Sequence, residues 1–277
     1  MFSTPLELTL FVTSSGVEMF SLTKQHCMII SNYHNNKDNL LSAGTKHLYL
    51  IPSMLGESAL TGSIPDYNLE VIRKLKYFVV ENIRSARRFL IKCGIVTPID
   101  EIQFYELNEH TNFKVIAEIL SSSGNNNIGL ISEAGLPAIA DPGAELIREA
   151  HLRNLTVIPL VGPSSVFLAL MASGLNGQQF AFNGYLPVKE NERNLKIRFF
   201  EKRSRSENQT QIFIEAPYRN NRLFNAFIEQ CSQETLLCIA SNITLDNEWI
   251  STKSIQEWKN MPLPDLKNKP AVFILKA

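Results

Sequence analysis

The chain has 277 residues, 44% of them hydrophobic, and 27 Lys and Arg residues balance 27 Asp and Glu residues. This length and apolar content are enough to bury a sizeable core and to form two compact domains. The neutral balance argues against a protein that holds nucleic acid by net charge alone, although it leaves room for local basic patches. No apolar run is long enough to cross a bilayer, and no basic segment precedes the apolar residues near the amino terminus as in a signal peptide.

We therefore expect a cytoplasmic protein. Its four cysteines, Cys27, Cys93, Cys231 and Cys238, have no metal-ligand spacing and are expected to be reduced thiols. The histidines also lack a paired spacing, so no metal site is expected.

Residues 1–46 are rich in Ser, Thr and Asn and are predicted to form a poorly ordered N-terminal extension. From residue 47 onward, apolar runs alternate with amphipathic segments. The predicted strands are 46–52, 77–80, 128–131 and 156–160, and the predicted helices are 83–92, 113–121, 144–153 and 166–173. This alternation indicates an α/β domain over 47–160 with a mostly parallel sheet.

The pattern changes after Gly174, which is predicted to end a helix. Later strands have shorter or more polar connections, which indicates a second, α+β domain over 161–277. A charged segment starts with 180–187, and the predicted elements that follow are strands over 211–215, 235–241 and 271–276 and a helix over 219–230.

The segment 131–143 joins a strand to a helix through small residues and prolines. Ala134 and Gly135 allow close backbone approach, while Asp141 is predicted to be the helix N-cap with Pro142 at the first helical position. Two further strand-end segments, 52–56 and 159–165, repeat this composition. Open α/β sheets bind ligands at the carboxyl ends of their strands, so the three loops are candidates for one site. The alternative is an ordinary strand-to-helix turn.

The chain has no G-x-G-x-x-G, no G-x-x-x-x-G-K-[ST] and no G-x-S-x-G motif. Dinucleotide binding, nucleoside triphosphate binding and a hydrolase serine are therefore not indicated. The chain has two basic segments. Each is either a solvent-exposed helix face or charged loop, or a surface that contacts a nucleic-acid phosphate backbone. The first contains Arg84, Arg87, Arg88 and Lys92; the second contains Arg193, Lys196, Arg198, Lys202, Arg203 and Arg205.

Six motifs then occur in an order typical of one family. They are Tyr-Leu-Ile-Pro-Ser-Met-Leu-Gly at 49–56, Glu-Asn-Ile-Arg at 81–84, Ser-Glu-Ala-Gly-Leu-Pro at 132–137 with Asp-Pro-Gly at 141–143, Pro-Leu-Val-Gly-Pro-Ser-Ser at 159–165, Phe-Asn-Gly-Tyr-Leu-Pro at 182–187, and Glu-Ala-Pro-Tyr-Arg at 215–219. From 47 to 277 the chain resembles the tetrapyrrole methylase superfamily, specifically its RsmI branch, which methylates a cytidine 2′-hydroxyl in small-subunit ribosomal RNA. The resemblance implies two α/β domains, S-adenosylmethionine in the cleft between them, and a homodimer.

The resemblance also implies which residues form the site. The residues expected to bind the cofactor are Pro52, Met54, Leu55, Gly56, Ala134, Gly135, Leu136, Ile139, Pro163, Ser164 and Ser165, with Leu136 and Ile139 flanking the adenine. Methyl transfer depends mainly on positioning and needs no metal, but a hydroxyl acceptor benefits from a nearby base. Glu81 and Glu215 are the candidate bases, and Arg84 and Arg219 would bind acceptor phosphate or orient these acids. For each of the four, a structural ion pair is the alternative.

The chain departs from the family pattern at several positions. It has Glu57 where Asn is usual, Asn82-Ile83 for Asp-Thr, Glu133 for Asp, Leu136 for Thr, and Asn-Ile-Thr-Leu at 242–245 for Glu-Leu-Thr-Lys. The loops expected to bind the cofactor thus retain more of the family's motif residues than the segments expected to bind the methyl acceptor. Two alternatives to a ribosomal RNA methyltransferase follow: the same fold acting on another acceptor, such as a small molecule or a tetrapyrrole, and a non-catalytic cofactor-binding homologue.

Overall fold

The computed structural model describes residues 11–13, 16–18, 46–108 and 111–277. The chain divides into two compact units, Met1–Lys46 and His47–Ala277. In the first unit, β1 (Phe11–Thr13) and β2 (Gly16–Glu18) form an antiparallel pair. The rest of the predicted N-terminal extension, apart from Lys46, lies outside the described residues.

The second unit contains two five-stranded sheets, of which the first has the order β5-β4-β6-β3-β7. Its strands are β3 (His47–Ile51), β4 (Tyr77–Val80), β5 (Gln103–Glu106), β6 (Ile128–Ile131) and β7 (Thr156–Pro159). Every pairing in this sheet is parallel, as the alternation of strands and helices predicts.

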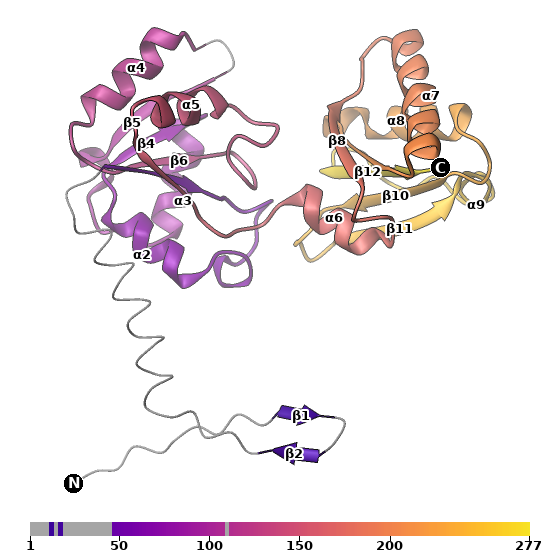
Figure 1. Ribbon diagram of the computed structural model, residues 1–277, viewed down its shortest axis with the longest axis horizontal. Helices are drawn as coiled ribbons and strands as arrows, with labels where there is room; N and C mark the ends of the chain where they lie inside the picture. Colours follow the sequence, from indigo (N-terminus) through magenta and orange to yellow (C-terminus); the bar gives the residue numbers. More distant parts are fainter. Residues whose placement is uncertain (1–10, 14–15, 19–45, 109–110) are drawn as a thin grey trace. The chain divides into compact units, whose positions relative to one another are not determined.

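Helices cover both faces of this parallel sheet (Figure 1). They are α2 (Asp66–Lys74), α3 (Ile83–Lys92), α4 (Phe113–Ser122) and α5 (Ala144–Leu152), with short 3₁₀ turns at η1 (Leu60–Gly62) and η2 (Ile99–Glu101). α4 and α5 bury Ile116, Leu120 and Leu146 against Leu48 and Leu130 of the strands. All four residues of β6 are buried, as expected for the central strand of a doubly covered sheet.

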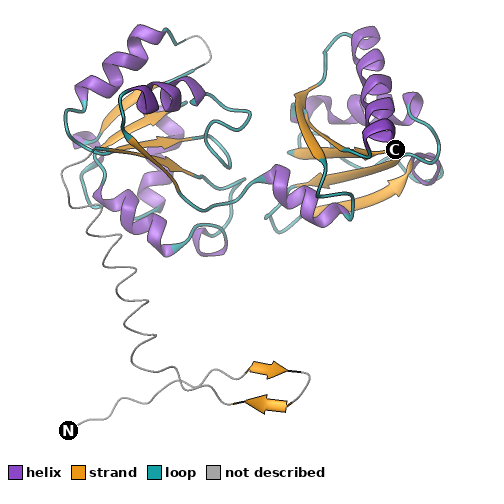
Figure 2. Ribbon diagram, in the orientation of Figure 1, coloured by secondary structure: helices purple, strands orange, loops and turns teal. Residues whose placement is uncertain are grey.

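The second sheet has the order β11-β10-β12-β9-β8. Its strands are β8 (Phe180–Tyr185), β9 (Thr210–Ile214), β10 (Leu236–Ser241), β11 (Trp249–Ser254) and β12 (Ala271–Lys276), and its helices are α6 (Ser165–Ser173), α7 (Glu190–Glu207), α8 (Asn220–Gln230) and α9 (Ile255–Lys259), with η3 (Pro217–Arg219) before α8. Only β8 and β9 pair in parallel; the other pairings are antiparallel. Figure 2 shows this mixed sheet with its helices.

Alternation along β12 distributes its side chains between two cores. Phe273 and Leu275 pack on the side of α7, α8 and α9. Val272 and Ile274 pack on the side of α6. Because strand side chains alternate between faces, one apolar strand can hold helices on both sides of the sheet.

The start of α5 corrects the predicted N-cap. α5 begins at Ala144 with Gly143 as its N-cap, and no side chain makes a capping hydrogen bond. Gly143 has φ +136°, and a side chain there would meet Leu130 at 2.9 Å. Asp141 is therefore not the N-cap and Pro142 is not the first helical residue, because the chain enters the helical conformation only after this glycine.

Among the described residues, no helix is both long enough and apolar enough to span a membrane. The three described cysteines, Cys93, Cys231 and Cys238, are buried and free. Burial raises the pKa of the Cys93 thiol to about 12, so this thiol stays protonated and unreactive at neutral pH.

Gly129 in β6 provides a test of the packing of the parallel sheet. A Cβ at this position would lie 2.6 Å from Cδ1 of Ile51 and 2.9 Å from Cδ1 of Phe78. We expect Gly129→Ala to lower the free energy of unfolding by about 1–3 kcal/mol through overpacking, measured by chemical denaturation. Gly177→Ala, where a Cβ meets nothing within 4 Å, is the matched control and should change stability by less than about 0.5 kcal/mol. Equal effects of the two variants would contradict this packing.

Candidate functional site

The loops that follow β3 and β6 are joined by backbone hydrogen bonds. The amide of Ser53 donates to the carbonyl of Gly135 at 2.9 Å, and the amide of Gly135 donates to the carbonyl of Ser53 at 3.2 Å. The hydroxyl of Ser132 donates to the same Gly135 carbonyl at 2.9 Å. These bonds fix the two loops side by side beyond the carboxyl ends of their strands.

The third loop, which follows β7, packs against the first two. A Cβ on Gly162 would lie 2.3 Å from Cβ of Pro52, and a Cβ on Gly135 would lie 3.5 Å from the carbonyl oxygen of Pro163. Asn68 of α2 supports this loop, because its amide donates to the carbonyl of Val161 at 2.7 Å. The structure thus brings together the three loops that share the small-residue composition.

The loop between β6 and α5 has an unusual backbone. Gly135, Ala138, Ala140 and Gly143 all have positive φ, at +78°, +64°, +62° and +136°. Left-handed backbone costs an L-residue such as alanine roughly 1–2 kcal/mol. Strain of this kind persists where the surrounding structure demands one loop shape, and it concentrates at ligand sites.

A cavity of about 540 Å³ opens where the first two loops meet α3. This volume lies within the roughly 300–1,000 Å³ typical of ligand pockets. Five of the predicted site residues line it: Met54, Leu55, Gly56, Ala134 and Glu81. Ser53 also lines it, and its buried hydroxyl oxygen has no hydrogen-bond partner within the described part of the chain. The walls therefore combine small residues with at least one polar group that a ligand can satisfy.

A smaller cavity of about 180 Å³ shares Leu55 and Ala134 with the first. Its other walls include Ser165, Glu215 and Asn242. The cavity therefore joins the loops of the parallel sheet to residues at the end of the second sheet. The side chain of Leu245 makes a further contact of this kind, because a Cβ on Gly56 would meet its Cδ1 at 2.9 Å.

The remaining predicted cofactor residues do not line either cavity: Pro52, Gly135, Leu136, Ile139, Pro163 and Ser164. Pro52 and Gly135 hold the loops in place, as described above. The hydroxyl of Ser164 caps α6 by accepting from the amide of Phe167 at 3.5 Å. Ile139 is 46% exposed, so its side chain remains accessible to a ligand.

The two predicted acid and arginine pairs differ in the structure. Glu215 and Arg219 form an ion pair of 2.5 Å in which the glutamate side chain is 4% exposed. The same carboxylate accepts from the amide of Ala216 at 2.8 Å. This geometry accords with the structural ion pair considered as the alternative for these two residues. Arg84 lines an adjoining cavity on α3 together with Arg87 and Arg88, and Arg88 also lines the 540 Å³ cavity, as does Glu81.

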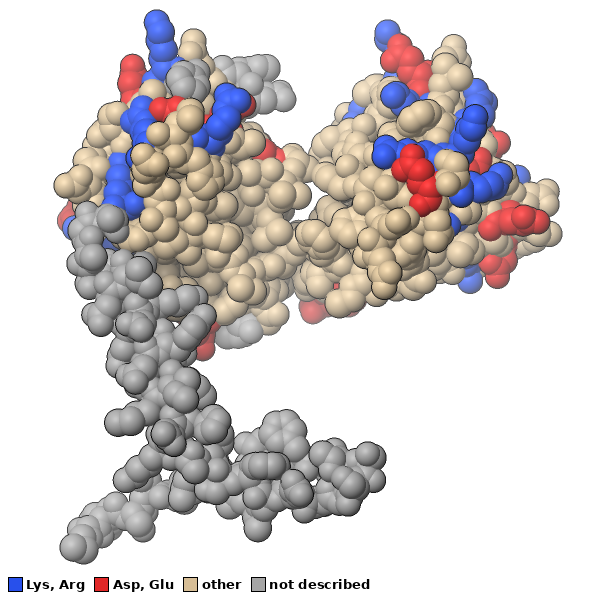
Figure 3. All heavy atoms as spheres, viewed as in Figure 1, with Lys and Arg blue, Asp and Glu red and all other residues tan. Residues whose placement is uncertain are grey.

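The second basic segment forms much of α7, and acids accompany its charges. Figure 3 shows Lys and Arg side chains interspersed with Asp and Glu side chains over this part of the surface. Arg203 pairs with Glu207 at 3.0 Å, and Arg193 is itself buried. A solvated helix face therefore describes α7 well. The basic residues of α3 line a cavity instead, so the two segments are not equivalent.

Asp141 and Tyr185 lie near the site, but the sequence motifs that contain them gave no reason to assign them a chemical role. Burial raises the pKa of Asp141 from 3.8 to about 6, and the neighbouring carboxylates of Glu81 and Glu133 add to this effect. Burial and then Asp141 and Glu215 raise the pKa of the Tyr185 phenol. Both residues stand within quoted motifs, but only the tertiary structure shows that they face the same group of carboxylates. The described residues hold no group of three or more side chains that could bind a metal ion.

The raised pKa of Asp141 predicts the pH dependence of stability. Between about pH 4 and pH 6 the native state holds a proton that the unfolded chain has released, so its stability falls as the pH rises through this window. Asp141→Asn removes the charge. We expect its melting temperature to exceed that of the parent at about pH 7 and to approach it at about pH 4. Thermal unfolding over this pH range measures the difference, and a difference independent of pH would contradict the assignment.

No protein-family model matches this chain. The ribosomal RNA small subunit methyltransferase I of Vibrio cholerae is 30% identical over 223 residues, covering 80% of this chain and 71% of that protein. The protein of the same name from Bacillus subtilis is 32% identical over 185 residues, covering 66% of this chain and 59% of that protein.

Among solved structures, the crystal structure of the methyltransferase CobJ matches with a TM-score of 0.55. The match covers 84% of this chain and 94% of that one at 13% identity. At this level of identity the likeness shows the fold, and it confirms the fold class expected from the sequence.

Proposed function

The chain belongs to the ribosomal RNA small subunit methyltransferase I family, and we propose that it transfers a methyl group from S-adenosylmethionine to a ribose 2′-hydroxyl of small-subunit ribosomal RNA. The observation that carries the proposal is the 540 Å³ cavity at the converging strand-end loops, with Glu81 in its wall. Such a cavity at the carboxyl ends of parallel strands is where this class of sheet holds ligands.

The residues of the cavity fit S-adenosylmethionine. Its amino acid and ribose groups need several hydrogen-bonding partners, which the backbone of 54–56 and of Ala134 and the side chains of Asn82 and Ser85 in the cavity wall can supply. Leu136 and Ile139 would flank the adenine, and 163–165 would support the loops from behind. When bound, the cofactor supplies an electrophilic methyl group on a sulfonium centre.

Glu81 is the proposed partner of the acceptor hydroxyl. It follows β4 directly and lines the cavity beside Met54 and Ala134. A carboxylate there can accept the proton that the hydroxyl loses as it attacks, which is the ordinary role of a general base. Glu215 is already bound by Arg219 and by a backbone amide, so the proposal gives it a positioning role.

The basic residues of α3 are the proposed contacts for the RNA backbone. Arg84, Arg87 and Arg88 line a cavity that shares Asn82 and Arg88 with the cofactor cavity. Arginines in such a position can bind phosphates and fix the register of an RNA strand without reading its sequence.

The proposal includes a cytoplasmic homodimer, where ribosomal RNA would be accessible. α6 carries no charged residue, and it exposes Phe167 and Met171 at 52% and 77%. An apolar helix face of this kind supports a contact with a second copy.

Mapping of ribose methylation tests the acceptor. Small ribosomal subunits from cells that lack the gene should lack one 2′-O-methyl group, and the purified full chain with S-adenosylmethionine should restore it. Glu81→Gln should bind S-adenosylmethionine normally but restore the methyl group about 100- to 10,000-fold more slowly, as expected when a general base is lost.

Unchanged methylation in the cells that lack the gene would exclude this acceptor. Cofactor binding without any transfer would then favour a different acceptor or a non-catalytic homologue. A fully active Glu81→Gln variant would show that another group takes the proton.

Gly135→Val tests the placement of the cofactor. Its Cβ would lie 3.1 Å from Cδ2 of Leu55 on a backbone with φ +78°, which a β-branched residue adopts only with strain. The loop must shift to relieve this strain, and we expect the shift to weaken the affinity for S-adenosylmethionine roughly 10- to 100-fold in calorimetry. Gly177→Val is the control, because a Cβ there meets nothing within 4 Å. Retained affinity in Gly135→Val would place the cofactor elsewhere.

A further inference from the structure

Tyr185 stands at the end of a bulged strand. Phe182 of β8 pairs with Ile212 of β9, but the next pair is Tyr185 with Ile214, so β8 holds one extra residue. Gly184 takes φ +64° within this bulge. Without the extra residue, Gly184 would stand opposite Ile214 and Tyr185 would face the other side of the sheet. The bulge therefore turns the tyrosine to the side of α6, where Ile214 lines the smaller cavity.

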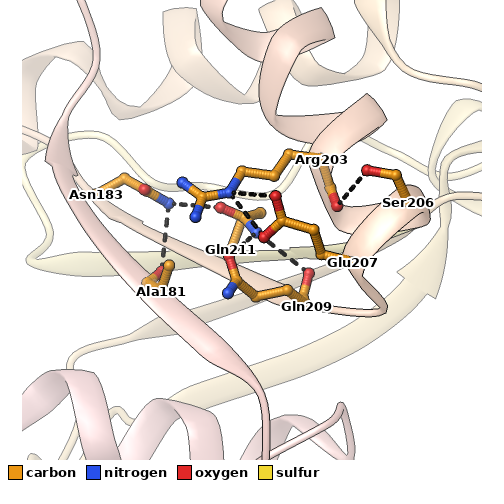
Figure 4. A network of polar contacts seen from close by, with 7 residues as sticks. All are labelled: Ala181, Asn183, Arg203, Ser206, Glu207, Gln209 and Gln211. Carbon is orange, nitrogen blue, oxygen red and sulfur yellow. Dashed lines mark hydrogen bonds and ion pairs between the residues drawn. The ribbon is translucent and has the colours of Figure 1, made fainter.

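Hydrogen bonds between Asn183 and the buried Gln211 hold this bulge. The amide of Asn183 donates to the side-chain carbonyl of Gln211 at 3.0 Å and to the carbonyl of Ala181 at 3.2 Å (Figure 4). Gln211 is 0% exposed and is itself bound to Gln209. Partly buried hydrogen bonds thus hold the bulge that directs Tyr185. Its ring is nevertheless 56% exposed, whereas the next residue, Leu186, is buried.

A second tyrosine lies beside the ion pair of Glu215 and Arg219. Tyr218 is 74% exposed, and the guanidinium carbon of Arg219 lies 5.5 Å from the centre of its ring. The Nε of Arg219 is buried without a hydrogen-bond partner among the described residues. Tyr185 pairs with Ile214 of β9, the residue directly before Glu215, so both tyrosines adjoin this pair.

We infer that Tyr185 and Tyr218 form a stacking platform for an unpaired nucleobase of the RNA acceptor, which rests on the proposed function. Two exposed rings next to the Glu215–Arg219 ion pair, whose arginine side chain is 20% exposed, leave apolar area for a ligand to cover. Unstacked bases are bound in this way by aromatic rings and guanidinium groups. Neither tyrosine lines the 540 Å³ cavity, so the platform is separate from the proposed cofactor contacts.

The first test measures binding and needs no catalysis. The probe is a short fluorescently labelled oligocytidine RNA, and fluorescence anisotropy gives its affinity for the full chain. Tyr218→Ala and Tyr185→Ala should each weaken binding roughly 10- to 100-fold, while Tyr218→Phe and Tyr185→Phe should stay within about threefold of the parent. Tyr67→Ala, an exposed tyrosine of α2, is the matched control and should not change the affinity.

The second test uses methyl transfer to small ribosomal subunits. The alanine variants should raise the KM for the subunits by the same factor and leave the affinity for S-adenosylmethionine unchanged in calorimetry. A parent protein that binds the oligonucleotide through these tyrosines but methylates no subunit would support the platform and refute the proposed function.

Other outcomes overturn the platform. These are a parent protein that does not bind the oligonucleotide, alanine variants that bind it as well as the parent, and phenylalanine variants that are no better than alanine. A loss of affinity for S-adenosylmethionine in the alanine variants would instead assign the tyrosines to the cofactor.

Discussion

The reciprocal hydrogen bonds between Ser53 and Gly135 are the constraint on which the site depends. Ile51 and Ile131 are paired neighbours at the ends of the parallel strands β3 and β6, and the antiparallel bridge joins the two loops just beyond them. Only a residue that tolerates a φ of +78° can make this bridge and still let Leu55 pack against its Cα side. The bridge sets the floor of the cavity, and the loop after β7 then packs against both of its partners.

The charges around this floor are arranged unevenly. Carboxylates of Glu81, Glu133 and Asp141 lie close enough together to affect one another, which disfavours a further negative charge at that point. The arginines of α3 lie next to them, around the adjoining cavity. An acceptor that presents a hydroxyl to the acids and phosphates to the arginines suits both regions, and a polynucleotide has both groups.

The sequence predicts those strands and helices whose apolar residues follow a clear periodic pattern. The predicted strands of the parallel sheet follow apolar runs, and each is present with small shifts at the ends. Among the elements that were not predicted are α2, β5, β8, β11 and α9. β5 is a four-residue edge strand with exposed ends, and β11 carries mostly polar residues at the edge of the second sheet, so neither has the apolar alternation that marks a strand. α2 buries Asn68 together with Val71 and Ile72, which weakens its apolar period.

By itself, the sequence determined that small-residue loops follow three strands, and the order of its motifs determined the family. Local composition can do this because glycine, proline and apolar runs act through their own backbone and near neighbours. Only the tertiary structure decided that Gly143, and not Asp141, is the N-cap of α5, that Glu215 is held by Arg219, and that the charges of Asp141 and Glu215 act on the phenol of Tyr185. These features depend on distances between residues far apart in the chain, and such distances are fixed only when the sheets pack and the loops meet.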